Sequence, residues 1–192
     1  QHLVDKIVLP SRPKSEWPLV VGFSDITVLH ALMSLHGVPS LHASMCKALA
    51  TLPEDSEALK LLKNALKSGK IEVFSGIEGH KVIGGNLSLL HALQGTPYSL
   101  NAIIDGCEKP PMLLLEDIGE RHYHIDRMLH NLRLSGVLSR LDGVIVGQFT
   151  DCEDDPLMSC SIQETIAELF AEYDYPIIWD APYGHVDENH PI

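Results

Sequence analysis

The stretch from Pro18 to His36, PLVVGFSDITVLHALMSLH, decides the fold expected for this chain. Residues 19–21 form a short apolar run typical of a buried parallel strand, and the apolar residues after Thr27 recur at helical spacing as far as Gly37. Gly22 permits a tight backbone turn between the two elements. The stretch therefore predicts a strand, a sharp turn and a helix, the order expected in α/β proteins with a parallel sheet.

Ser24 lies at the apex of this predicted turn. There its hydroxyl is exposed, and the first free N–H groups of the helix lie close by. This is the geometry of a nucleophile elbow, the turn that presents a catalytic serine in hydrolases. A serine just before an amphipathic helix is more often a simple N-cap, and Ile26 stands where the hydrolase pattern GxSxG has its second glycine. The local sequence leaves both interpretations open.

Composition narrows the class of protein and of partner. A chain of 192 residues with 45% hydrophobic residues can bury a sizeable core. Lys and Arg number 14 against 26 Asp and Glu, and the net charge of -12 disfavours nucleic acid or an anionic membrane surface as a partner. No apolar run approaches the roughly 18 residues of a membrane span. The four cysteines form no CxxC pair, so we expect free thiols, as in a cytosolic protein.

A charged amphipathic stretch divides the sequence. Residues 51–70 predict a linking helix that stops at Gly69. Residues 1–50 are then interpreted as the C-terminal part of a parallel-sheet domain that carries Ser24, and residues 71–192 as a smaller, β-rich α/β domain. Apolar runs in this second domain predict strands at 71–74, 81–83, 111–115, 141–149 and 176–179, and periodicity predicts helices at 125–135 and 162–173.

Two polar residues follow predicted strands of the second domain, at the sheet edge where open α/β proteins meet their ligands. Glu116 directly follows the apolar run PMLLL, and His185 lies just beyond the last predicted strand. With Ser24 they supply a hydroxyl nucleophile, an orienting acid and an imidazole base, in an order that hydrolases use. The alternatives are that Glu116 is a surface carboxylate or a helix cap, and that the trio arises by chance among 11 His and 26 acidic residues.

Gly84, Gly85 and Asn86 form a third candidate feature. A glycine pair brings the backbone close to a neighbouring group, so these residues are candidates for substrate binding. The alternative is a plain, tight connection from a strand to the following helix.

Several motifs together resemble the LD-carboxypeptidase family of serine peptidases, which includes cytoplasmic muramoyltetrapeptide carboxypeptidases and relatives that hydrolyse microcin C. The motifs occur in order over nearly the whole chain. They are GFSDIT (22–27), GGNLSLL (84–90), LLLEDIGE (113–120) with IDRML (125–129) and LSG (134–136), GVIVGQF (143–149) and YGH (183–185).

The resemblance implies a role for each candidate residue. Ser24 would be the nucleophile, Glu116 the orienting acid and His185 the general base, with the backbone N–H of Asp25 as one oxyanion donor. It implies a two-domain cytoplasmic enzyme that needs no metal and no other cofactor. Its peptide substrate would lie in the cleft between the domains, and a homodimer is compatible with the family. The expected reaction is the release of terminal D-Ala from murein tetrapeptide in cell-wall recycling, with hydrolysis of a microcin C-type conjugate as the alternative.

The sequence departs from the family pattern at both ends. It lacks the family's N-terminal strands, the early glycine-rich segment that donates a second oxyanion N–H, and the Pro- and Gly-containing stretch after the catalytic His. The chain also begins QHLVDKIVLP, without an initiator Met. We therefore expect a fragment that is a poor enzyme by itself, and we expect the strand before Ser24 to be an interior strand of a larger sheet.

Two other function classes remain open at this point. The HYHID sequence offers His122, His124 and Asp126 as ligands of a metal-dependent hydrolase, with His185 as a fourth. The remaining class is a binding module, a relative that holds a cell-wall peptide without cleaving it.

Overall fold

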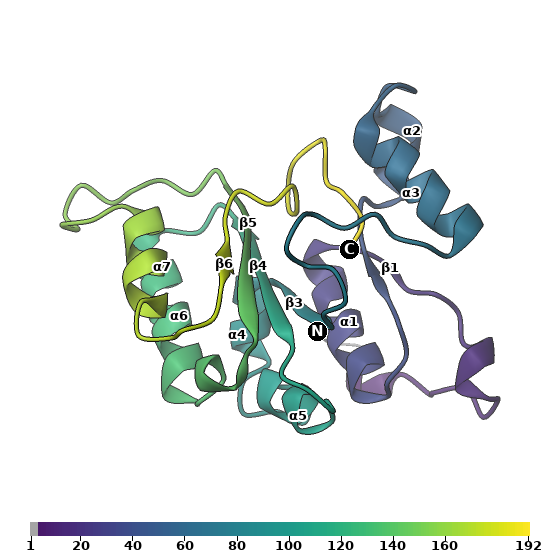
Figure 1. Ribbon diagram of the computed structural model, residues 1–192, viewed down its shortest axis with the longest axis horizontal. Helices are drawn as coiled ribbons and strands as arrows, with labels where there is room; N and C mark the ends of the chain where they lie inside the picture. The colour runs from purple at the N-terminus through teal and green to yellow at the C-terminus, as the bar shows by residue number, and fades with distance from the viewer. Residues whose placement is uncertain (1–3) are drawn as a thin grey trace.

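The computed structural model describes residues 4–192 and contains two separate β-sheets (Figure 1). The smaller sheet pairs β1 (Val21–Gly22) with β2 (Leu41–His42). The larger sheet has the strand order β3-β4-β5-β6, formed by Val82–Asn86, Met112–Ile118, Gly143–Thr150 and Ile177–Ile178. Every pairing in both sheets is parallel, which confirms the predicted α/β class.

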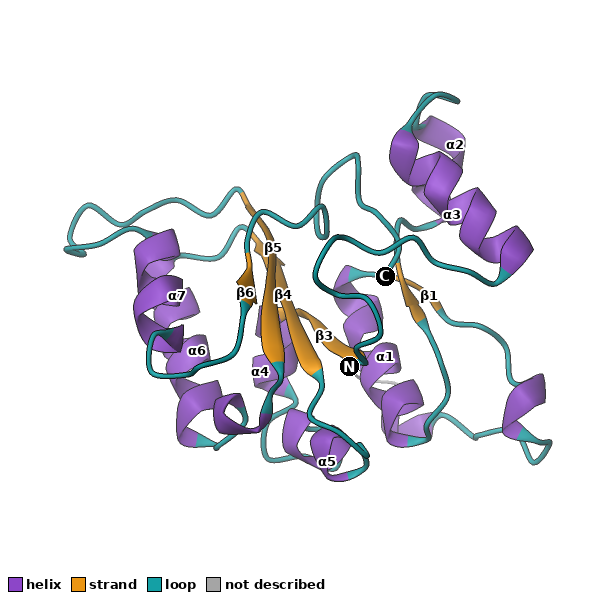
Figure 2. Ribbon diagram, in the orientation of Figure 1, coloured by secondary structure: helices purple, strands orange, loops and turns teal. Residues whose placement is uncertain are grey.

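The helices alternate with the strands, as parallel connections require. They are α1 (Thr27–Leu35), α2 (Cys46–Thr51), α3 (Glu57–Ser68), α4 (Leu87–Ala92), α5 (Leu100–Asp105), α6 (His122–Leu134) and α7 (Ile162–Phe170), with 3-10 helices at Val4–Lys6, Lys14–Glu16, Ser24–Ile26 and Leu138–Arg140. Figure 2 shows α6 and α7 beside the larger sheet, and α2 and α3 at the opposite end of the molecule. None of these helices, within the part of the chain described, is long and apolar enough to cross a membrane.

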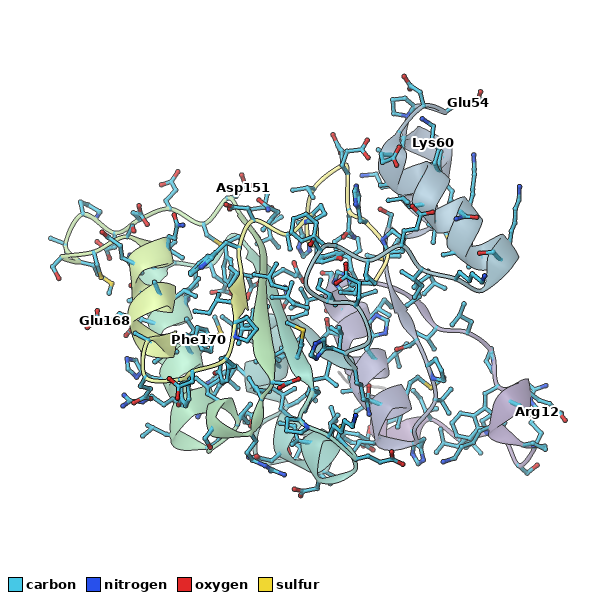
Figure 3. The ribbon with its side chains drawn as sticks, in the orientation of Figure 1. Arg12, Glu54, Lys60, Asp151, Glu168 and Phe170 are labelled. Carbon is cyan, nitrogen blue, oxygen red and sulfur yellow. The ribbon has the colours of Figure 1, made fainter. Side chains whose placement is uncertain are left out.

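The central strand β4 is buried on both faces. Leu113 and Leu115 belong to the main core, which α4, α6 and α7 cover, and Leu114 belongs to a smaller cluster on the other face with Ile77 and Tyr183. Figure 3 shows Phe170 on the side of α7 that faces the sheet. Because side chains alternate along a strand, Glu116 lies on the same face as Leu114.

The first helix packs against the larger sheet although it follows β1. Val28, Ala31 and Leu32 of α1 belong to the same core cluster as Ile83 of β3 and Leu115 of β4. Figure 1 shows α1 between the two sheets. This packing positions the turn before α1 at the boundary between the sheets, and the predicted division into domains stays a prediction.

One predicted strand is absent, and the predicted linking helix is shorter than expected. Residues 71–74 form no strand. The main-chain N–H of Phe74 donates instead to the Tyr183 hydroxyl at 3.2 Å, and the neighbouring edge of β3 is occupied by α1, whose Thr27 Oγ1 accepts from Asn86 N–H. The linking helix predicted within 51–70 is α3, which begins only at Glu57, and a separate helix, α2, ends at Thr51. Pro53 follows the end of α2 and disfavours helical geometry at the residue before it.

The helix-end predictions were better. Gly69 ends α3 in the left-handed conformation with φ 68°. Ser161 and Glu164 form a capping box at the start of α7. Within residues 4–192, β1 pairs with a strand on one side only, so its place inside a larger sheet stays a prediction.

Candidate active site

The turn after β1 holds Ser24 in a strained conformation. Phe23 is fully extended, and Ser24 then has φ 58°, a value that costs a non-glycine residue about 1–2 kcal/mol. Gly22 is required just before it, since a Cβ there would lie 2.8 Å from Ile26 Cγ1. Neither the 3-10 helix Ser24–Ile26 nor α1 has a side-chain cap hydrogen bond, so Ser24 is not an N-cap. The left-handed backbone of Ser24, and a hydroxyl that is not used to cap a helix, are features of a nucleophile elbow.

Ser24, His185 and Glu116 converge although they lie far apart in the sequence. His185 Nε2 lies 3.0 Å from Ser24 Oγ, and His185 Nδ1 lies 2.8 Å from Glu116 Oε2. An ionised carboxylate only accepts hydrogen bonds, so Nδ1 carries the ring proton. Nε2 is then left as an acceptor for the serine hydroxyl, the arrangement that general-base activation of a nucleophile requires.

Glu116 is completely buried and tightly enclosed, so it is neither a surface carboxylate nor a helix cap. A Cβ added at Gly184 would lie 3.1 Å from Glu116 Oε2. A Cβ added at Gly147 would lie 3.3 Å from Glu116 Cβ and would overlap the Tyr183 carbonyl oxygen. These two glycines make room for the acid, and sequence reasoning gave neither of them this role. The signal was available at Gly147, because a glycine inside a strand marks a close approach of neighbouring groups.

The His185 main chain and ring are held from both sheets. Thr150 Oγ1, at the end of β5, donates to the His185 carbonyl oxygen at 3.0 Å. The Phe23 ring, from the serine turn, packs edge-on against the imidazole with centroids 4.8 Å apart. The His185 side chain is 15% exposed, so the imidazole is partly accessible to solvent.

Gly84, Gly85 and Asn86 join β3 to the first turn of α1. A Cβ at Gly85 would lie 2.7 Å from Thr27 Oγ1, and that oxygen accepts from Asn86 N–H at 3.1 Å. The Asn86 side chain caps α4 by accepting from Leu89 N–H. The backbone of Gly85 thus lies close to Thr27, three residues after Ser24, and that of Gly84 lies close to β4, where an added Cβ would be 2.3 Å from the Leu114 carbonyl oxygen. Substrate binding by these three residues stays a prediction, as does the oxyanion role of Asp25, which directly follows Ser24.

Asp117 is a buried acid that sequence reasoning did not single out. Its two carboxylate oxygens accept from Asn86 Nδ2 and from Ser88 N–H, each at 2.8 Å. Burial raises the pKa of Asp117, while these hydrogen bonds oppose the rise. Asp117 therefore fixes the turn from β3 into α4 beside the end of β4. Its position after Glu116, at a strand end, was the available signal.

Two buried histidines support the serine turn. His30 of α1 donates from Nε2 to the Gly22 carbonyl oxygen at 2.9 Å, and its Nδ1 lies 2.8 Å from Ser40 Oγ. Burial lowers the pKa of His30. His42 of β2 has no hydrogen-bond partner on either ring nitrogen among the described residues, and burial lowers its pKa to about 3. Its ring centroid lies 6.0 Å from that of Phe23.

The histidines proposed as metal ligands have other partners. His122 begins α6 and is buried, with Nε2 2.7 Å from Thr165 Oγ1 and Nδ1 accepting from Asp155 N–H. His124 Nδ1 lies 2.9 Å from Glu120 Oε2. Across residues 4–192, no group of three or more His, Cys, Asp or Glu side chains is placed to hold a metal ion. The four cysteines are free thiols.

A cavity of about 520 Å³ lies next to the three converging residues and not at them. His30 and His42, residues of the loop before β3, the first residues of β3, and Leu114 and Ile192 line it. Ser24, Glu116 and His185 do not line it. The cavity therefore does not contain the side chains of the candidate active site.

Comparison with known proteins gives consistent results. A family model described as the LD-carboxypeptidase C-terminal domain matches residues 78–192, more than half of the chain. The murein tetrapeptide carboxypeptidase of Pseudomonas aeruginosa is 29% identical over 185 residues, which cover 88% of this chain and 58% of that protein. A putative carboxypeptidase of Streptomyces coelicolor is 31% identical over 177 residues, which cover 87% of this chain and 54% of that protein. The chain thus spans a little over half the length of these curated relatives.

Solved structures share the fold. The muramoyltetrapeptide carboxypeptidase from Oxalobacter formigenes superposes with a TM-score of 0.75 at 24% identity, over 91% of this chain and 61% of that one. The microcin C7 self-immunity protein MccF superposes with a TM-score of 0.71 at 14% identity, over 93% and 63% of the two chains.

Proposed function

This chain belongs to the LD-carboxypeptidase family, and from that premise we propose that it carries the reacting residues of a serine carboxypeptidase that cleaves a peptide bond between an L- and a D-residue. The observation that carries the proposal is the hydrogen-bonded series from Ser24 through His185 to Glu116. The substrate proposed is a murein tetrapeptide, from which terminal D-Ala is released, because a relative of this chain is named for that peptide.

In the proposed reaction, Ser24 Oγ attacks the carbonyl carbon of the scissile bond while His185 Nε2 takes its proton. Glu116 accepts from the Nδ1–H throughout, so it holds the required tautomer and stabilises the imidazolium. The imidazolium then gives its proton to the leaving amine. Water, deprotonated by the same imidazole, hydrolyses the acyl-serine and restores the free enzyme.

The main-chain N–H of Asp25 is proposed as one donor to the oxyanion that forms on the carbonyl oxygen. It follows the nucleophile at the start of a helical turn, the place that hydrolases with this elbow use. Removing one such donor from a hydrolase typically costs about 100- to 1,000-fold in rate. The left-handed conformation of Ser24 supports this role, because it places the hydroxyl and the following N–H on one small turn.

The test uses the full-length protein with murein tetrapeptide and with a microcin C-type conjugate, and mass analysis of the products. We expect loss of terminal D-Ala from the tetrapeptide, unaffected by a metal chelator. Ser24→Ala should lower kcat/KM by roughly 10⁴- to 10⁶-fold. Ser139→Ala, on an exposed turn whose hydroxyl bonds only the Gly136 carbonyl oxygen, is the matched control and should leave the rate unchanged.

Other outcomes decide between the alternatives. If the protein cleaves the microcin C-type conjugate and not the tetrapeptide, the conjugate is the substrate. Binding of either peptide without turnover would show a non-catalytic binding protein. Turnover by Ser24→Ala within threefold of the unaltered protein would remove Ser24 as the nucleophile.

A further inference from the structure

The turn that carries His185 is closed by a buried asparagine from farther along the chain. Asn189 is 1% exposed, and its Oδ1 accepts from the main-chain N–H of Gly184 at 3.0 Å. Gly184 directly precedes His185, so this bond fixes the backbone from which the imidazole projects. The side-chain amide must point this way, because an N–H donor needs the oxygen and not the NH₂ group opposite it.

The same asparagine also connects this turn to the other sheet. Its main-chain oxygen accepts from Ser44 Oγ at 3.2 Å, just after β2. Next to Ser44, the Ala43 N–H donates to the Gly22 carbonyl oxygen at 3.0 Å, two residues before Ser24. A short series of hydrogen bonds therefore runs from the His185 turn through Asn189 to the turn of the nucleophile.

Residues 186–192, hereafter the C-terminal segment, lie across the gap between the two sheets. Figure 1 shows this segment in yellow, running from β6 towards β1. Ile192 and His42 exchange two main-chain hydrogen bonds of 2.8 Å, so the segment pairs with β2. Glu188 Oε2 accepts from Ala58 N–H at 2.7 Å, at the start of α3. The segment reaches the His185 turn through the bond of the Asn189 side chain to Gly184 and through the His190 N–H, which donates to the Pro182 carbonyl oxygen at 2.8 Å, and the first of these is the one next to His185.

Asn189 supplies a hydrogen bond that an apolar side chain cannot supply. Asn189 Nδ2 is buried and has no hydrogen-bond partner among residues 4–192. An unpaired buried donor is unfavourable, and a leucine of similar volume would remove this donor but leave the buried Gly184 N–H without its acceptor. Only a side chain with an acceptor can hold the Gly184 N–H, which indicates that this one bond is the reason for the residue.

We propose that Asn189 is a positioning residue for His185, which sets the reach of the imidazole to Ser24 by tying the Gly184–His185 turn to the sheet that carries the nucleophile. The proposal rests on the proposed function and deepens it. Ser24 and His185 belong to different sheets, and their 3.0 Å separation depends on how those sheets are held together. A misplacement of about 1 Å in such a pair can cost about 100-fold in rate.

The experiment compares variants of the full-length protein on one tetrapeptide substrate. Asn189→Leu removes the acceptor but keeps the volume, and we expect kcat to fall about 10- to 100-fold with KM changed less than about twofold. Asn189→Asp keeps an acceptor of the same shape. At a pH where His185 is neutral, it should keep kcat within about fivefold of the unaltered protein. Hydrogen exchange at the Gly184 amide should be faster in the leucine variant only.

Glu188→Ala is the matched control. It breaks another contact of the C-terminal segment without touching the His185 turn, so it should lower thermal stability and leave kcat unchanged. If Asn189→Leu does not fold, Ser44→Ala replaces it, because it breaks the other end of the same connection. That variant should lower kcat several-fold at constant KM.

The outcomes separate this proposal from the function on which it rests. If Ser24→Ala turns over at the rate of the unaltered protein, the proposed function is wrong. If Ser24→Ala is inactive but Asn189→Leu keeps the full kcat, or Glu188→Ala loses as much as Asn189→Leu, the positioning role alone is overturned.

Discussion

The serine side and the acid–base side of the candidate site are built in different ways. Ser24 is held by its backbone, in a left-handed turn between a two-residue strand and α1. Glu116 is held by packing, inside the longer strand β4 and against backbone where Gly147 and Gly184 leave room for it. Substitutions at Ser24 should therefore change the stability of the fold by changing backbone strain. Substitutions beside Glu116 should change it by adding or removing volume in a tightly packed region.

The largest effect that tests this contrast is expected on the acid side. Glu116→Gln keeps the shape of a completely buried side chain but removes the charge that holds the His185 tautomer. We expect kcat to fall by about 10⁴-fold. Glu120→Gln, which alters an acid paired with His124 on the neighbouring turn, is the control and should keep full activity. Steady-state kinetics on one peptide would measure both. A Glu116→Gln variant with nearly full kcat would mean that the acid does not orient the base.

Added volume on the acid side should destabilise the fold. Gly147→Ala would place a methyl group against the Tyr183 carbonyl oxygen, and we expect a loss of about 1–3 kcal/mol in the free energy of unfolding. Gly106→Ala is the matched control, since Gly106 has φ -89° and its nearest contact would be 3.5 Å. Urea unfolding of both variants measures the difference. Equal losses would show that the space beside Glu116 is not tightly filled.

Acid should weaken the fold through the serine side. Burial lowers the pKa of His42 from its ordinary value of 6.5 to about 3 in the folded protein, so the unfolded state binds more protons between these pH values. Above pH 6.5, His42 is neutral in both states and does not lower the free energy of unfolding. As the pH falls from 6.5 towards 3, the unfolded state gains a proton that the folded state does not, and the free energy of unfolding decreases. At pH 5 the loss is roughly 2 kcal/mol, from 1.36 kcal/mol per pKa unit.

The check is the dependence of unfolding free energy on pH between 5 and 7. His42→Leu should make this dependence less steep, and His91→Leu, at an exposed position of α4, should leave it unchanged. An unchanged slope in His42→Leu would place the acid sensitivity elsewhere.

The smallest effect is expected from relieving strain at the nucleophile. Ser24→Gly should be inactive and yet more stable than Ser24→Ala by about 1 kcal/mol, because glycine adopts φ 58° without the cost that alanine bears. Thermal unfolding of the two variants gives the comparison. If the glycine variant is the less stable of the two, the turn stores no strain and the contrast between the two sides fails.

The same contrast explains what the sequence could and could not predict. The turn at Ser24 is a local feature, and Gly22, the apolar run and the helix after it were enough to place it. Glu116 and His185 were found because each follows an apolar strand, which puts a polar side chain at the ligand-binding edge of a sheet. The strand expected at 71–74 is absent: Val73 packs against the smaller core cluster and the Phe74 N–H donates to the Tyr183 hydroxyl, long-range contacts that periodicity does not encode.

Long-range packing was beyond the reach of sequence patterns. The roles of Gly147 and Gly184 depend on the side chain of Glu116, which is remote in sequence from both. Asn189 has no motif of its own, and its importance appears only when Gly184 and Ser44 are seen on either side of it.

The central claim is that residues from two sheets work as one unit, and a double-variant cycle of Ser24→Ala and His185→Ala tests it most directly. With kcat measured on one peptide in the full-length protein, each single variant should lose roughly 10⁴- to 10⁶-fold, and the double variant should be no slower than the slower single one. Losses that multiply in the double variant, or a single variant that keeps most of its activity, would show that Ser24 and His185 act independently and would contradict the account.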